Sequence, residues 1–518
     1  MWAPRAAALL VIGATGATLP SGLHAEAPLS AIEWLSQSVA TPALLPREPV
    51  PAGGPPVSKG VMPGSITVAP IGGPVIESLG LISAQRAGLP RDLWGSSSST
   101  DLARLLRAEA PDTLPAIQAL LYSLLIAELD PPKGSDFDGA LFLARVDKLL
   151  DLGALDPALA LLELIDQPKP EAFRRWFDIS LLLGQEDHAC AVMTKSPQIA
   201  PTFPARIFCL ARGGDWNAAA LSLRTGQTLG TIDPNMADLL SRFLDPEIYA
   251  DQPDLSMPDR PSPLVLRLME AIGQPMATTT LPVAFAQADL RSNAGWKARV
   301  EAGERLARMG AVPPNRLLGL YTERKAAGSG GVWDRVKAVQ ALEAALHAHD
   351  TAAITETLPL VWSQMRDMEL EVPFADLFGP QVASAGLSGE TGSLAFRIGL
   401  LSQDSEKIAT AAAPSDSTEA FLAGLARGDV AGKVPPDQLG VAIQAAFAEG
   451  ATPGESLSLL LADHKLGEAL LKAMDKVTSG ASGELRDVTE GLTLLRQVGL
   501  EATARHAALE LLLLERRG

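Results

Sequence analysis

The chain has few of the residues on which catalytic and metal sites depend. Its 518 residues include two cysteines and six histidines, and aromatic residues make up only 5%. It contains no His-Glu-x-x-His motif and no Cys/His cluster with the spacing of a zinc site. Residues 424–434 resemble a phosphate-binding loop, but the spacing between Gly428 and Gly432 is one residue too short. We therefore expect a protein that is not an enzyme and has no cofactor and no metal.

Positive charge is also scarce, and so are long apolar runs beyond the N-terminus. The chain has 60 acidic and 43 basic residues, which gives a net charge of −17. An acidic surface repels nucleic acids and anionic membranes, so we expect neither as a partner. No later stretch reaches the roughly 18 uncharged apolar residues that a transmembrane helix needs. We expect no integral membrane span after the signal sequence is cleaved.

The first residues have the pattern of a secretory signal peptide. Arg5 supplies the positive charge, residues 6–19 form a short apolar stretch, and Leu23 and Ala25 suit a signal peptidase. We predict cleavage after Ala25; the alternative is an uncleaved anchor. An alanine-rich chain with such a signal suggests a Gram-negative bacterium, so the expected location is the periplasm.

Residues 41–64 are rich in proline and glycine and lack periodicity, which is typical of a linker. The linker follows a short amphipathic segment with Ile32, Trp34 and Leu35. That segment either docks on a partner or folds back on the body, and the sequence leaves both open. Residues 65–68 have the composition of a lone short strand, and we expect no other sheet.

What the chain has in abundance is alanine, leucine and helical periodicity, and residues 141–226 repeat one pattern three times. Three turn glycines lie at steps of 31 and 30 residues: Gly153, Gly184 and Gly214. An alanine follows each glycine by five residues: Ala158, Ala189 and Ala219. A phenylalanine precedes each by eleven: Phe142, Phe173 and Phe203. Prolines 170 and 201 follow the first two glycines, and we expect them to stop the second helix of each pair.

This block resembles the tetratricopeptide-repeat (TPR) family in its glycine, alanine, aromatic and proline positions. The resemblance implies an all-α fold in which helical hairpins stack as a solenoid, because no single pair can bury its apolar face. The expected organisation is a signal peptide (1–25), an N-terminal segment with the linker (26–100), a TPR-like domain (101–245), an irregular connection (246–290) and a C-terminal helical repeat domain (291–518). The connection is placed at the Pro- and Asp-rich stretch 245–263.

The two cysteines, Cys190 and Cys209, fall on adjacent repeats, on helices that should pack antiparallel. In an oxidising compartment an even number of cysteines favours a bridge, so we predict a disulfide between them. The alternative is a pair of buried free thiols.

The segment FRRWFD at 173–178 is the main candidate for partner binding. Arg174 and Arg175 flank Trp176 in an otherwise acidic chain, and Arg and Trp are frequent anchors of interfaces. The competing interpretation is structural: Trp176 fills the core between repeats and the arginines pair locally.

A long helical-repeat surface is typical of proteins that bind other proteins. We therefore expect an exported, non-catalytic scaffold or adaptor. The combination of signal, linker and helical body is similar in build to periplasmic flagellar-motility scaffolds, which implies motor or stator components as partners and a role in motility. An envelope-protein assembly factor or chaperone and a lytic enzyme on a helical toroid are the alternatives.

Overall fold

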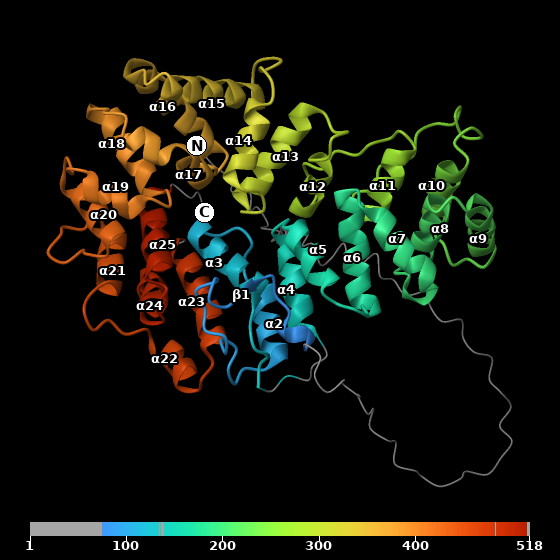
Figure 1. Cartoon of the computed structure of the whole chain (residues 1–518), viewed down its shortest axis with the longest axis horizontal. Helices are drawn as coiled ribbons and strands as arrows, with labels where there is room; N and C mark the ends of the chain where they lie inside the picture. Colours follow the sequence, from blue (N-terminus) through green and yellow to red (C-terminus); the bar gives the residue numbers. More distant parts are fainter. Residues whose placement is uncertain (1–74, 134, 136–138, 482, 515–518) are drawn as a thin grey trace, which may run out of the picture.

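The computed structural model describes residues 75–133, 135, 139–481 and 483–514 (Figure 1). The predicted signal peptide, linker and short strand lie outside the described residues. Within them the fold is all-α, as the sequence predicts, with 3₁₀ turns at Ile76–Ser78, Pro197–Ile199 and Val283–Phe285. One small sheet was not expected: β1 (Ile82–Ser83) pairs in parallel with β2 (Ala127–Glu128).

The first described helices are α2 (Ser99–Ala108), α3 (Pro115–Ile126) and α4 (Ala140–Asp151). Ser98 caps α2, because its hydroxyl accepts a hydrogen bond from the backbone N–H of Asp101 at 3.0 Å. The buried guanidinium of Arg145 on α4 fastens this region together. It donates to the backbone carbonyls of Leu79, Leu125 and Ala127 at 2.8–2.9 Å.

The threefold sequence pattern forms three helix pairs. They are α4 with α5 (Leu155–Glu163), α6 (Pro170–Leu183) with α7 (Glu186–Lys195), and α8 (Phe203–Arg212) with α9 (Trp216–Thr228). The three turn glycines have φ values of 73°, 73° and 85°, which confirms that each turn requires a left-handed residue. The three alanines that follow are fully buried.

The proline expectation needs correction. Pro170 does not end a helix; it is the first residue of α6, where its missing N–H costs nothing. The preceding α5 has already ended at Glu163.

The chain then turns back along the repeats. Helix α10 (Pro234–Leu244) packs on α8 and α9, and α11 (Pro263–Ala271) packs on α6 and α10. Helix α12 (Ala286–Asp289) also contacts α6. The region expected to be an irregular connection therefore contains two helices that pack on the repeats. Helices α5–α11 form a projection that we call the arm (Figure 1).

Helical hairpins of varied length make up the second half of the chain. Their bounds are α13 (Trp296–Arg308), α14 (Pro314–Thr322), α15 (Val332–His347), α16 (Thr351–Asp367), α17 (Glu371–Ala383), α18 (Gly389–Leu400), α19 (Ser405–Ala411), α20 (Ser417–Arg427), α21 (Gln438–Ala446), α22 (Glu455–Ala462), α23 (Leu466–Ala481), α24 (Leu485–Gln497) and α25 (Glu501–Leu513).

The last helices return to the first ones. Helix α25 packs on α3, and α23 packs on α2 (Figure 1). The N–H of Ser96 donates to His464 O at 3.1 Å, and the N–H of Gly467 donates to Leu93 O at 2.9 Å. Successive contacts run from α3 through α4, the 3₁₀ turn Val283–Phe285, α12, α13, α14, α17, α18, α20 and α25 back to α3. We call this closed circuit, together with α15, α16, α19 and α21–α24, which pack on it or on one another, the ring.

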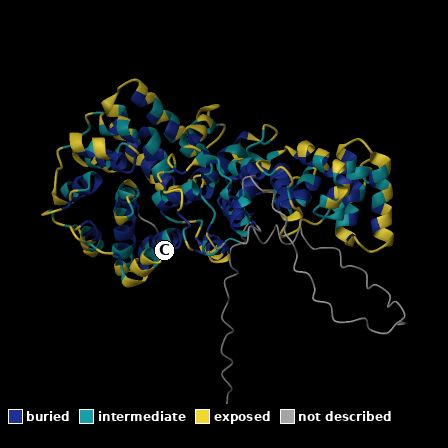
Figure 2. Cartoon of the chain, turned by 60° about the horizontal axis from the view of Figure 1, so that its bottom comes forward, coloured by how far each residue is buried: buried dark blue, intermediate teal, exposed yellow. Residues whose placement is uncertain are grey.

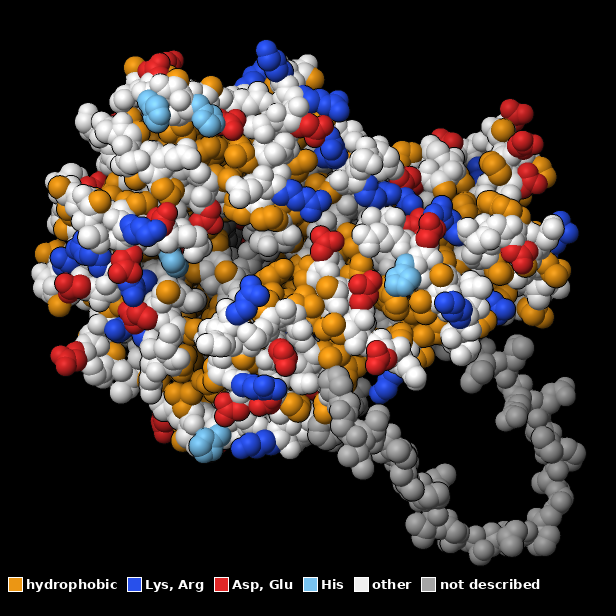
Figure 3. Space-filling model, in the orientation of Figure 1, with side chains coloured by type: hydrophobic (Ala, Val, Ile, Leu, Met, Phe, Trp, Pro, Cys, Tyr) orange, Lys and Arg blue, Asp and Glu red, His pale blue; other side chains and the backbone are white. Residues whose placement is uncertain are grey.

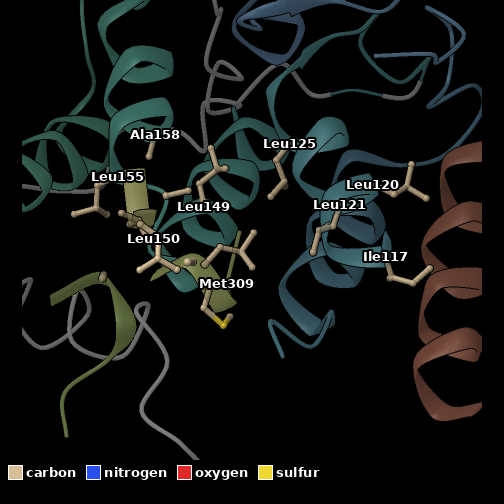
Figure 4. Packing of buried hydrophobic residues seen from close by; sticks show 14 of the residues in the cluster. Ile117, Leu120, Leu121, Leu125, Leu149, Leu150, Leu155, Ala158 and Met309 are labelled. Carbon is tan, nitrogen blue, oxygen red and sulfur yellow. The ribbon is translucent and has the colours of Figure 1, made fainter. Parts of the chain in front are cut away.

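A continuous hydrophobic core joins the ring and the arm (Figure 2). Figure 4 shows Met309, just after α13, between Leu149 and Leu150 of α4 on one side and Ile117 and Leu121 of α3 on the other. The arm and the ring therefore share one apolar interior, and the packing shows no break at the Pro- and Asp-rich stretch.

Candidate functional site

Cys190 and Cys209 lie at disulfide distance, with their sulfur atoms 1.97 Å apart and their Cα atoms 5.0 Å apart. Cys190 belongs to α7 and Cys209 to α8, so the pair joins adjacent repeats as the sequence predicts. Both side chains are buried. The bridge therefore stabilises the arm rather than forming a reactive centre.

Arg175 of the predicted binding segment is engaged inside the protein. Its guanidinium makes a two-point contact with Asp147, with Nε at 2.5 Å and Nη2 at 3.0 Å from the carboxylate oxygens. Asp147 is only 1% exposed and also lies 3.6 Å from Nε of Arg107. The carboxylate therefore connects α2, α4 and α6.

Trp176 and Arg174 are also buried. Trp176 is 7% exposed and makes edge contacts with Phe173 and with His188 of the next helix. Arg174 donates to Pro201 O at 3.4 Å, and burial lowers its pKa. This geometry matches the structural alternative that the sequence left open. Contact of the segment with a partner stays a prediction, and its side chains have little exposed surface to offer.

The ring encloses a cavity of about 520 Å³, lined mainly by α3, α17, α25 and the turn between α13 and α14. Asp376 accepts a hydrogen bond from the N–H of Gln403 at 3.1 Å, and burial raises its pKa to about 6. His506 lies 3.1 Å from the Ser405 hydroxyl, and burial lowers its pKa. Glu510 accepts the N–H of Ala116 at the start of α3. Two of these groups hold α25 in place, and Asp376 can exchange a proton near pH 6.

Groups of His, Cys, Asp and Glu suited to a metal ion are absent from the described residues. None of the helices in the described part of the chain is both long and apolar enough to cross a membrane.

The outer end of the arm exposes large apolar side chains. Half of the ten large hydrophobic residues that the described chain leaves exposed lie between residues 216 and 257. Trp216, the first residue of α9, is 50% exposed, and its indole lies near Phe243 of α10. Ile248 and Met257 follow α10 and are 67% and 51% exposed. The end of a helix stack is normally covered by polar residues, so this exposure is unusual.

The loop that carries Ile248 and Met257 is rich in acidic residues. Residues 245–260, the distal loop, carry five exposed acids: Asp245, Glu247, Asp251, Asp254 and Asp259. Arg260 is the one base in the loop. Figure 3 shows acidic and hydrophobic side chains together at this end of the arm. We call Trp216 together with the distal loop the distal surface.

The distal loop is held in place although it has no helix or strand. Arg242 of α10 donates to Pro253 O at 2.8 Å and lies over the ring of Tyr249. The side chain of Gln274 accepts the N–H of Leu255 at 3.0 Å and donates to Asp254 at 2.9 Å. The loop is therefore fixed at several points between α10 and the end of α11.

The sequence indicates a boundary at 245–263 and does not single out Ile248. It offers Trp216 only as one of five tryptophans near helix starts and turns, each of which could fill the core or anchor a binding surface. The one sequence signal for this surface is an isoleucine and a methionine within an acidic stretch. Composition alone does not distinguish such a stretch from a linker. No family model matches the chain, and no curated protein or solved structure matches it either.

Proposed function

We propose that this chain is an exported, non-catalytic helical-repeat scaffold that binds another protein through its distal surface. The observation that carries the proposal is the exposure of Trp216 at the start of α9 and of Ile248 and Met257 on a loop that is fixed in position. Exposed aromatic and aliphatic side chains on a rigid support are the usual anchors of protein interfaces. A pre-ordered loop loses little conformational entropy when a partner binds.

Export is part of the same proposal. It is supported by the signal-like first 25 residues and by the cysteine pair, since disulfides persist in oxidising compartments such as the periplasm. The stacked helix pairs of the arm support a TPR-like solenoid as the scaffold. Among periplasmic machines we propose the flagellar motor or its stator as the setting, with motility as the process.

A capture experiment tests the binding function. The tagged mature chain is incubated with periplasmic extract, and captured proteins are identified by mass spectrometry. We expect a specific protein to be lost from the Trp216→Ser/Ile248→Ser variant. The matched control, Leu360→Ser/Leu459→Ser, changes apolar residues that are 62% and 58% exposed on the ring. The proposal is wrong if both variants melt like the wild type and capture the same proteins.

A deletion strain tests the biological setting. Loss of swimming with intact filaments supports a motor scaffold. A broad loss of envelope proteins would instead support an assembly factor.

A further inference from the structure

The distal surface also indicates the chemistry of its partner. Resting on the proposed function, we infer that the distal surface binds a basic amphipathic segment of a partner protein. Between residues 215 and 260 the chain has eight acidic and three basic residues, and one of the three, Arg242, is buried. The exposed charge around Ile248 and Met257 is therefore strongly negative, and it complements a segment that carries lysine or arginine beside apolar side chains.

The loop carboxylates are available for such a partner. Glu247 and Asp251 are exposed, whereas Asp254 is occupied by the amide of Gln274. Ile248 lies between Glu247 and Asp251 in a turn of the chain, so one apolar contact is flanked by two acids. In the proposed complex, an apolar side chain of the segment contacts Ile248 and its basic side chains pair with Glu247 and Asp251.

Charge also argues against the other occupants of an apolar surface. A second copy would bring five loop acids against five loop acids, and like charges at short distance repel. An anionic membrane would repel the loop for the same reason. A basic protein segment gains both from burial and from charge, and its encounter with the surface is accelerated by electrostatic attraction.

Binding of a synthetic peptide tests the inference. The probe is a labelled helical peptide with lysines on one face and leucines on the other, titrated with the mature chain at physiological ionic strength. We expect Glu247→Lys/Asp251→Lys to weaken binding by at least about tenfold. We expect the control Glu356→Lys/Glu449→Lys, which makes the same charge change at exposed positions on the ring, to weaken it by no more than about twofold.

A second pair of variants separates apolar contact from charge. Ile248→Asn should also weaken binding of the peptide, and Leu459→Asn on the ring should leave its binding unchanged. Equal losses in the loop and ring charge variants would mean that the peptide responds only to net charge, which would overturn the inference. A dimer or an anionic vesicle that binds through Ile248 would overturn it as well. The capture experiment does not use the peptide. If the Trp216→Ser/Ile248→Ser variant loses its captured protein but the peptide does not bind the mature chain, the inference is rejected and the proposed function stands.

Discussion

At the residue scale, the clearest feature is that the charged side chains of the predicted binding segment make their contacts inside the protein. Asp147 is almost completely buried and is held by Arg175 in a two-point contact. Arg175→Glu would place a second carboxylate against it. Because a buried charge without a partner is costly, we expect a loss of about 3–5 kcal/mol in the free energy of unfolding. Urea denaturation at neutral pH measures it.

Arg206→Glu, on the exposed side of α8, is the control for that change and should have little effect. An Arg175→Glu variant with wild-type stability and no partner capture would show that the segment is a binding site after all.

Glu109, at the end of α2, gives the protein a pH dependence. Burial and the nearby charge of Asp475 raise its pKa from 4.5 to about 8. The folded state therefore holds a proton that the unfolded state releases above pH 4.5, so this group lowers stability as the pH rises from 4.5 to 8.

Glu109→Gln removes that titration. We expect the variant to exceed the wild type by on the order of 2 kcal/mol at pH 8–9, and the difference to vanish near pH 4–5. Thermal unfolding across this pH range measures it. A constant difference at every pH would contradict the assignment.

At the element scale, the arm depends on contacts between successive helix pairs. The Cys190–Cys209 pair closes a short loop of the chain between α7 and α8, across a sequence separation of 19 residues. We expect Cys190→Ser/Cys209→Ser to lower the free energy of unfolding by about 3 kcal/mol, because the unfolded chain gains entropy. Guanidinium denaturation of the oxidised protein measures it. Reduction of the wild type should reproduce the loss, and no change on reduction would mean that the cysteines are not joined.

Many of the helices and turns could be predicted from the sequence. Gly153, Gly184 and Gly214 mark turns that need a positive φ, and the cysteine pair follows from the repeat spacing. Local periodicity carries this information because each pair is built from neighbouring residues. It does not show which way a proline acts, since Pro170 suits the start of a helix as well as the stop after one.

Contacts between residues far apart in the chain could not be predicted from the sequence. Arg145 was not singled out, because its partners are backbone carbonyls whose positions no side-chain pattern reveals. The fixed position of the distal loop could not be predicted for a similar reason: Arg242 and Gln274 hold the loop through its backbone. Patterns of side chains predict which faces are buried, and they do not predict such backbone anchors.

At the scale of the whole molecule, the ring closes where α23 meets the first described segment. Gly467 lies against the fully buried indole of Trp94, and a Cβ added to Gly467 would be 2.5 Å from Cε3 of that indole. We expect Gly467→Ala to lower the free energy of unfolding by about 1–3 kcal/mol through overpacking. Gly319→Ala on α14 is the matched control, because its Cβ meets open space. It should be neutral or raise stability by up to about 1 kcal/mol. Equal effects in thermal unfolding would mean that the closure is absent.

In the proposed function, the far end of the arm, rather than the ring, carries the partner contact. Site-specific photo-crosslinking in living cells tests it most directly, with the crosslinking residue placed at Ile248 or at Leu459, two exposed apolar positions on the arm and the ring. We expect a discrete adduct from Ile248, in which the crosslinked peptide is basic and contains apolar residues, and no adduct from Leu459. An adduct from Leu459 alone, or none from Ile248 in cells that make the full-length folded protein, would contradict the proposed function.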